Sequence, residues 1–308
     1  MEPDGAPAAS VAGPPRRTRR GPRFGLGADG ARALLVAAVS TVVVFGALGA
    51  LVVNAPGWPR FQEAYLNGPV FWDALPKVIG KFWVNVRLFL VAEVLILVFG
   101  LALAVLRSLP GPVFFPVRLL ATLYVDLFRA LPGVLVILML GLGIPALRIE
   151  GMPKDEFLWA VVVLTLIYSA YVSEVYRAGI ESIHASQSAA ARSLGLSQLQ
   201  TMRFVVVPQA VRRVIPPLLN DFIGLQKDTV LVSFIGVVEI FRQTQILQSA
   251  RFNFTPYLAT ALVFVVVTVP LARFTDWLIA RQRSQRDGGR GLPLGLLGNR
   301  GRGVGGIR

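Results

Sequence analysis

The sequence predicts an all-α protein that crosses a membrane several times, and its composition, its apolar runs and the placement of its charges support this prediction. Of the 308 residues, 54% are hydrophobic and only 16% are charged, with a mean hydropathy of +0.62. Soluble domains usually contain about 25% charged residues. The 31 Lys and Arg outnumber 17 Asp and Glu and collect at both chain ends and in residues 177–213. This distribution indicates membrane topology rather than a nucleic-acid-binding face.

Composition also excludes several classes of chemistry. With no cysteine and a single histidine, His184, the chain cannot form disulfides, thiolate metal sites or most His-based catalytic sites. Each of its four lysines is followed by Val, Phe or Asp, and never by the Ser or Thr of a phosphate-binding loop. We therefore expect a chain that is not an enzyme, does not hydrolyse ATP alone and binds no cofactor or metal itself.

The two ends of the chain predict disordered basic tails, residues 1–32 and 283–308, because they are rich in Gly, Pro and Arg and lack apolar periodicity. Residues 33–53 are free of charge and would span about 30 Å as a helix, the thickness of the hydrocarbon core. We expect this segment to be the first transmembrane helix. A cleaved signal peptide is the alternative, although the segment is longer than a usual signal-peptide core.

Five further apolar spans follow, each bounded by Gly, Pro or charge, at about residues 83–106, 119–147, 157–176, 214–238 and 257–280. If both termini lie inside, the cytoplasmic segments hold 20 Lys and Arg and the external loops hold seven. Cytoplasmic loops are enriched in these residues. The sequence therefore predicts a multi-pass protein of the cell membrane with both termini in the cytoplasm.

The segment 184–208 is polar and alanine-rich, and it interrupts the apolar spans. Residues 187–194 predict a short helix that ends at Gly195 in the left-handed conformation. Ser197 and Gln200 have the spacing of a capping box, which predicts the start of a second short helix. A helix with a small-residue face can enter a groove on a partner. Periodicity alone does not separate such docking from an ordinary surface loop.

Two pairs of charged residues lie at the predicted ends of apolar spans. Asp126 with Arg129, and Glu174 with Arg177, are each three positions apart, so each pair can meet on one helical face. Structural pairing at the cytoplasmic end is the favoured interpretation. Asp126, Arg129 and Glu174 are also candidates for a transport path or gate.

Polar residues gather in the middle of the fifth span: Asn220, Asp221, Gln226, Lys227, Asp228 and Thr229. A charged side chain in lipid costs at least about 2.5 kcal/mol, so these residues must face a cavity or a partner. We expect Asn220, Asp221, Lys227, Asp228 and Thr229 to line a path or gate suited to a zwitterionic solute. Interhelical salt bridging is the alternative.

The loop carries a family resemblance. Residues Ala189-Ala190-Ala191-Arg192-Ser193-Leu194-Gly195, followed nine residues later by Val205-Val206-Val207-Pro208, resemble the EAA-x3-G-x9-I-x-L-P signature of inner-membrane permease subunits of ABC importers. Residues 124–132, 171–180, 208–216 and 220–229 are similar to the polar amino-acid branch of that family, of histidine, glutamine and glutamate type. The resemblance covers residues 83–282.

The sequence departs from the family pattern at three places. Ala189 replaces the signature Glu, Ala130-Leu131 replaces Gly-Thr, and Val230 replaces Ser. If Ser186 is the N-cap, a Glu at position 189 would complete a second capping box, which this chain lacks.

The resemblance implies a type I ABC importer permease fold, with a five-helix core plus one extra N-terminal helix. It also implies four partners: a cytoplasmic ABC ATPase dimer that holds ATP and Mg, a second permease chain that is a copy or a paralogue, an extracytoplasmic amino-acid-binding protein, and lipid. The ATPase would contact the loop through Ser186, Ala189, Ala190, Ala191, Gly195, Ser197 and Pro208. Its closure would drive alternating access.

The substrate implied by the resemblance is a polar amino acid. The long N-terminal extension resembles a glutamate-importer permease type, while glutamine and basic amino acids stay open. Two other functions compete. An ion-coupled carrier usually has internal repeats, and none is visible here. A membrane-embedded enzyme would need a nucleophile, a metal cluster or a His-acid pair, which the sequence does not offer.

Overall fold

The computed structural model describes residues 28–286, with their side chains from residue 31 to residue 282. Every regular element in this part of the chain is helical, and the chain divides after Arg60 into two units, which are described separately. The predicted tails 1–32 and 283–308 lie mostly outside the described residues. Where they overlap the described part, the chain is helical, because the first helix begins at Ala28 and the last ends at Arg286.

The first unit contains α1 (Ala28–Val53), whose apolar side chains are exposed around the whole helix, as at Leu35, Phe45 and Leu51. Lipid can solvate such a surface, whereas water would not. Residues 31–53 are long and apolar enough to cross a membrane. The structure is thus helical throughout the predicted segment 33–53, and the helix begins five residues earlier than expected.

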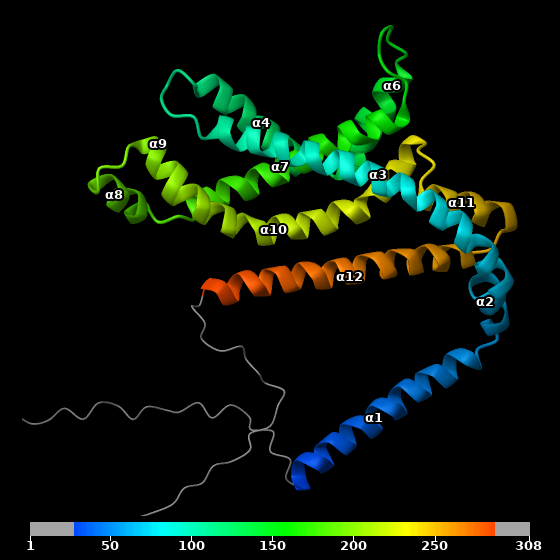
Figure 1. Ribbon diagram of the computed structural model, residues 1–308. Helices are drawn as coiled ribbons and strands as arrows, with labels where there is room; N and C mark the ends of the chain where they lie inside the picture. Colours follow the sequence, from blue (N-terminus) through cyan, green and yellow to red (C-terminus); the bar gives the residue numbers. More distant parts are fainter. Residues whose placement is uncertain (1–27, 287–308) are drawn as a thin grey trace, which may run out of the picture. The chain divides into compact units, whose positions relative to one another are not determined.

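The second unit is an assembly of helices drawn in Figure 1. Its elements are α2 (Trp58–Tyr65), which starts in the first unit, α3 (Gly68–Arg107), α4 (Phe115–Ala130), α5 (Gly133–Val136), the π-helix η1 (Ile137–Gly143), α6 (Ile144–Ala146), α7 (Glu156–Glu181), α8 (Ala185–Ser193), α9 (Gln198–Thr201), the π-helix η2 (Met202–Val206), α10 (Val207–Asp228), the 3-10 helix η3 (Thr229–Ile235), α11 (Ile240–Arg251) and α12 (Thr255–Arg286).

The core of this unit forms around α7, the most deeply buried of the long helices. Fully buried apolar side chains join α3, α7, α10 and η3, among them Leu88, Ile96, Val163, Leu164, Leu225 and Val232. Most of α12 stays exposed, and Figure 1 shows it in orange at one edge of the assembly. Its apolar outer face is suited to lipid or to another membrane protein.

Two glycines allow the long helices to pack closely against α7. A Cβ at Gly100 of α3 would lie 2.7 Å from Val172 Cγ1, and a Cβ at Gly179 of α7 would overlap Val214 Cγ1 of α10. Small residues at crossings are the usual means by which membrane helices approach one another. These two crossings place α3 and α10 directly on α7.

The six spans predicted from the sequence correspond to four candidate membrane-spanning helical segments and two bent pairs. The prediction of one continuous span at 119–147 is wrong, because α4 and the segment Gly133–Ala146 meet at an angle of 109°. Pro132 lacks a backbone N–H, and Leu131 before it is extended, with φ −83° and ψ 139°. The bend therefore has a local cause in the sequence.

The predicted span at 214–238 is also interrupted. The α-helix ends at Asp228, tightens into η3 and stops at Gly236, whose φ is +100°. The segments on either side are bent by 52°. In contrast, α3 is longer than predicted: its 40 residues correspond to about 60 Å of helix, twice the hydrocarbon thickness. The sequence predicted only the apolar second half, because Lys77 and Lys81 make the first half less hydrophobic.

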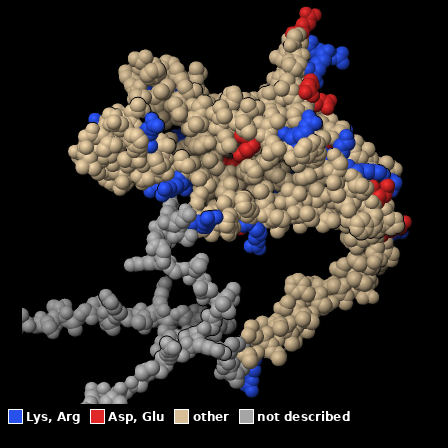
Figure 2. Space-filling model, in the orientation of Figure 1, with Lys and Arg blue, Asp and Glu red and all other residues tan. Residues whose placement is uncertain are grey.

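In the view of Figure 2, many charged residues gather at the two ends of the second unit, and fewer lie between them, among them one acidic patch at mid-length. One end carries the connection from α7 to α10, and the other carries α6 and α11 (Figure 1). This distribution is expected when the middle band lies in hydrocarbon and both ends reach water.

Candidate functional site

The connection between α7 and α10 contains the two short helices that the sequence predicted, but the first begins earlier than expected. His184, and not Ser186, is the N-cap of α8, because His184 Nδ1 accepts a hydrogen bond from Ser186 N at 3.2 Å. Ala189 is therefore the fifth helical residue instead of the third. A Glu at this position would not complete a capping box with Ser186, so that interpretation was wrong.

The turn between α8 and α9 has the predicted geometry. Gly195 has a φ of +86°, and Leu196 N donates to Ala191 O at 3.3 Å, the hydrogen bond of a Schellman motif. Ser197 and Gln200 form the predicted capping box, in which Ser197 Oγ accepts from Gln200 N and Gln200 Oε1 accepts from Ser197 N. These hydrogen bonds at the helix ends help to give the loop a defined shape, and Val206 anchors it in a small buried cluster with Ile183 and Ala210.

The outer surface of this loop includes exposed apolar side chains. Leu194 is 82% exposed and Leu199 is 78% exposed, and Ala189 and Ala190 are also exposed, whereas Ala191 is buried. Two leucines beside small alanine side chains are costly to leave in water. The arrangement is suited to docking into a groove on a partner. We call residues 184–208 the coupling loop.

The coupling loop joins α10 through a widened helical turn. The π-helix η2 ends at Val206, and Pro208 follows at the start of α10. Pro208 has no N–H to donate within the helix, and the wider turn avoids a clash of its ring with the preceding carbonyls. Gln209 Nε2 donates instead to Val205 O at 2.9 Å. Motion of the loop would therefore reach α10 through a continuous helical path.

A polar pocket of about 280 Å³ lies between α5, α7 and α10. Its lining residues are Gly133, Ile167, Tyr168, Tyr171, Asn220, Asp221, Gly224 and Asp228. Tyr168 Oη donates to Asp228 Oδ2 at 2.7 Å, while the buried oxygen Asp221 Oδ2 has no hydrogen-bond partner among the described residues. The pocket is therefore ready to accept hydrogen bonds from a polar solute.

The bend at Pro132 contributes to this pocket, because it turns Gly133 and α5 towards α7. Broken helices at the depth of a membrane usually line a cavity. Tyr168 and Tyr171 were missed in the sequence, because tyrosines in an apolar span are more often part of the core.

The structure separates the five polar residues that were predicted to act together on α10. Asn220, Asp221 and Asp228 share the polar pocket, but Lys227 is exposed and does not line it. Thr229 is buried elsewhere, where its Oγ1 lies 3.0 Å from Asn85 Nδ2. Neighbouring helical residues point about 100° apart, which lets Asn220 and Asp221 share the pocket, whereas Lys227 points to the exposed side of α10.

The two charge pairs also differ. Glu174 pairs with Arg177 as predicted, and it also accepts a hydrogen bond from Arg107 Nη1 at 2.8 Å. Arg129 lies 3.9 Å from Glu174 rather than beside Asp126, whose exposed carboxylate has no ion pair within the described residues. The predicted meeting of Asp126 with Arg129 is therefore wrong. Glu174 instead joins α3, α4 and α7 near the coupling loop.

Among residues 28–286, no group of three or more His, Asp or Glu side chains is arranged to hold a metal ion.

Comparison with known proteins agrees with this geometry. Residues 96–284 match the family described as the binding-protein-dependent transport system inner membrane component. A probable glutamine ABC transporter permease of Bacillus subtilis is 31% identical over 217 residues, which cover 70% of this chain and 98% of that protein. A glutamate transport system permease of Corynebacterium glutamicum is 33% identical over 210 residues, 65% of this chain and 91% of that protein.

The fold is also shared with a solved structure. A chain of an amino acid ABC transporter crystallised with histidines superposes with a TM-score of 0.62 at 31% identity, covering 67% of this chain and 94% of that chain. The coupling loop and the polar pocket both lie within the matched residues 96–284. This chain therefore belongs to the family of binding-protein-dependent transport system inner membrane components.

Proposed function

We propose that this chain is the transmembrane subunit of an importer that moves a polar amino acid into the cytoplasm, driven by a separate ATPase. The observation that carries the proposal is the coupling loop, a rigid pair of short helices with two exposed leucines and the residues of the ABC permease signature. An ATPase cleft that receives α8 and α9 would bury this surface. Closure of the ATPases on ATP would then pull on α10 through η2.

This proposal sets the orientation of the chain. The coupling loop lies in the cytoplasm of a cell whose plasma membrane holds the chain, and the end with α6 and α11 lies outside. Both termini are cytoplasmic, in keeping with the excess of Lys and Arg in the segments assigned to that side.

The solute path runs through the polar pocket. Asp221 and Asp228 offer acceptors for the ammonium group that every free amino acid carries, and Asn220 adds an amide. Glu174 and its arginines would brace the cytoplasmic ends of α3, α4 and α7 during the transition between inward-open and outward-open states.

The partners are an ABC ATPase dimer, a second permease chain, an extracytoplasmic binding protein and lipid. The exposed apolar faces of α3 and α12 leave room for both the second permease and lipid. The amino acid is glutamate or a similar polar one, a proposal supported by the similarity to glutamate and glutamine permeases.

Reconstitution tests the proposal. Proteoliposomes holding this chain with its ATPase, its binding protein and any second permease should take up radiolabelled glutamate or glutamine only when ATP is supplied on the ATPase side. Uptake by this chain alone, driven by an ion gradient, would contradict the proposal and would favour a self-sufficient carrier.

A further inference from the structure

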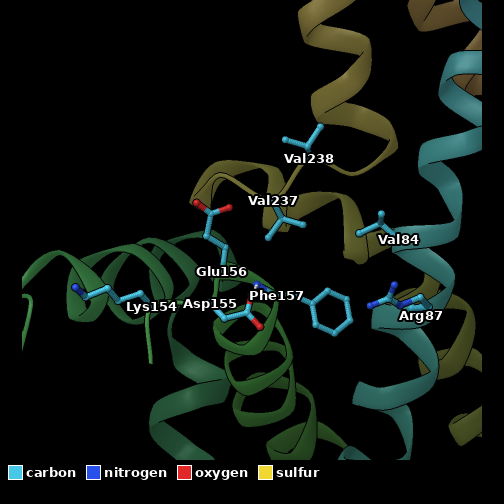
Figure 3. A pocket seen from close by; sticks show the side chains of 8 residues that line it. All are labelled: Val84, Arg87, Lys154, Asp155, Glu156, Phe157, Val237 and Val238. Carbon is cyan, nitrogen blue, oxygen red and sulfur yellow. Dashed lines mark hydrogen bonds between the residues drawn. The ribbon is translucent and has the colours of Figure 1, made fainter. Parts of the chain in front are cut away.

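A second hollow, of about 540 Å³, lies at the start of α7, the end of that helix farthest from the coupling loop (Figure 3). It is formed by α3, the first residues of α7 and the turn before α11. Its lining residues are Val84, Arg87, Lys154, Asp155, Glu156, Phe157, Val237 and Val238. The orientation proposed above makes this the extracytoplasmic end, so the inference rests on the proposed function.

Two cations of this hollow have no acidic partner. Neither Arg87 nor Lys154 forms an ion pair with a residue that the structure describes. The Arg87 guanidinium carbon lies 5.2 Å from the centre of the Phe157 ring, which orients the guanidinium (Figure 3). An oriented guanidinium binds a carboxylate with two parallel hydrogen bonds and loses little freedom in doing so.

A carboxylate on another wall is also available. Asp155 is already engaged, because its Oδ1 accepts from Phe157 N at 3.0 Å as the N-cap of α7. Glu156 has no hydrogen bond or ion pair within residues 31–282. Its carboxylate lies against Gly236, where an added Cβ would be 3.1 Å from Glu156 Oε1. Glu156 can therefore accept hydrogen bonds from an incoming ammonium group.

We propose that this hollow is an outer subsite for a free amino acid, in which Arg87 binds the α-carboxylate and Glu156 binds the α-ammonium group. Both signs of charge meet in one concave site whose volume is typical of small-molecule pockets. A zwitterion satisfies both signs at once, whereas a single acidic side chain of a partner protein would leave Glu156 unpaired.

The outer subsite and the polar pocket share one helix. Phe157 and Tyr168 are 11 positions apart on α7, which is about 16 Å along the helix axis. A solute released at the outer subsite would therefore reach the polar pocket by moving along α7. Arg87 and Glu156 act as positioning residues for entry.

Protection of a thiol tests the outer subsite. The chain has no cysteine, so Val238→Cys introduces a single thiol at the hollow. The complex with its ATPase, in lipid nanodiscs without binding protein, is treated with a maleimide, and labelling of this chain is followed over time. L-glutamine should slow labelling with saturation, about threefold at twice its dissociation constant. 4-Aminobutanamide, which lacks only the α-carboxylate, should not protect.

Variants in the Val238→Cys background identify the contact. Arg87→Gln should abolish protection by L-glutamine, whereas Arg242→Gln, which removes a cation of α11 outside the hollow, should leave it intact. Equal protection by L-glutamine and 4-aminobutanamide would overturn the outer subsite. ATP-driven uptake is measured on the same purified complex, reconstituted with the binding protein in proteoliposomes. Absent uptake contradicts the proposed function, while normal uptake without protection overturns only the subsite.

Discussion

Asn85 Nδ2 donates to Glu239 Oε2 at 2.9 Å, joining two residues that are 154 positions apart and are 2% and 0% exposed. Asn85 also accepts from Ile240 N at 3.1 Å, and its nitrogen lies 3.0 Å from Thr229 Oγ1. Glu239 in turn caps α11 by accepting from two backbone N–H groups. One amide therefore fixes α3 to the start of η3 and to the start of α11.

Replacing this amide should destabilise the chain. Asn85→Leu removes one of the hydrogen bonds to the buried Glu239 carboxylate and leaves the N–H of Ile240 without its partner, and each buried group that loses a partner costs about 1–3 kcal/mol. We expect a clear fall in the thermal midpoint of the purified protein. Asn54→Leu is the control, because Asn54 is exposed and bonds only its own helix. Equal midpoints for Asn85→Leu and the parent would contradict this account of the network.

The Glu174 cluster predicts unequal effects for two glutamates that both pair with Arg177. Glu174 has a side chain 23% exposed and also pairs with Arg107, which is 11% exposed, while the Glu181 side chain is 61% exposed. Glu174→Gln should cost about 1–3 kcal/mol, because it leaves Arg107 poorly solvated and unpaired. Glu181→Gln should cost below about 0.5 kcal/mol. The thermal unfolding midpoints of the two variants are compared, and equal midpoints would contradict this account of the cluster.

The crossing of α7 and α10 predicts a steric defect that can be rescued. Gly179→Ala would force a Cβ onto Val214, and overpacking of this kind typically costs about 1–3 kcal/mol. Gly179→Ala with Val214→Ala should recover part of the lost stability, because the second change removes the clashing methyl groups. Gly224→Ala is a milder comparison, since its nearest neighbour there is Tyr168 Oη at 3.6 Å. If the double variant were no more stable than Gly179→Ala alone, the proposed contact between Gly179 and Val214 would be contradicted.

The polar pocket predicts that adjacent residues of α10 differ in transport. Asp228→Asn should lower the rate of amino-acid uptake about tenfold, because a charge-assisted hydrogen bond is worth about 1.5–3 kcal/mol. Lys227→Gln should have a smaller effect, since Lys227 lies outside the pocket. Uptake is compared at equal amounts of each variant in proteoliposomes. Equal losses in both variants would remove the support for a path through this pocket.

Local sequence signals predicted the coupling loop well. The glycine turn at Gly195 and the capping box of Ser197 depend on residues within three or four positions, and both are present. The start of α8 was misplaced because His184 also accepts a backbone hydrogen bond, and histidine is not among the preferred N-cap residues. The bend at Pro132 had a signal in the sequence, because a proline lies inside the apolar run. The high hydropathy of that run nevertheless led to the prediction of a single span at 119–147.

Contacts between distant segments were not predictable in the same way. Nothing near Asn85 indicates that Glu239 will lie beside it, because the contact depends on how α3 packs against the turn before α11. Arg129 was paired with the wrong acid for a similar reason. A spacing of three residues permits contact with Asp126, but α7 brings Glu174 closer. The sequence therefore indicated which residues matter on α10 without separating the pocket residues from their neighbours.

The most direct test of the central claim compares two glycines with the same backbone conformation. Gly195 and Gly151 have φ values of +86° and +82°, and an added side chain would meet open space at each. Gly195→Trp and Gly151→Trp therefore impose a similar backbone strain, but only the first places bulk on the coupling loop. Co-purification of the ATPase and ATP-driven amino-acid uptake are measured for both. We predict that Gly195→Trp loses both and Gly151→Trp keeps ATPase binding; full ATPase binding and uptake by folded Gly195→Trp would contradict the coupling role.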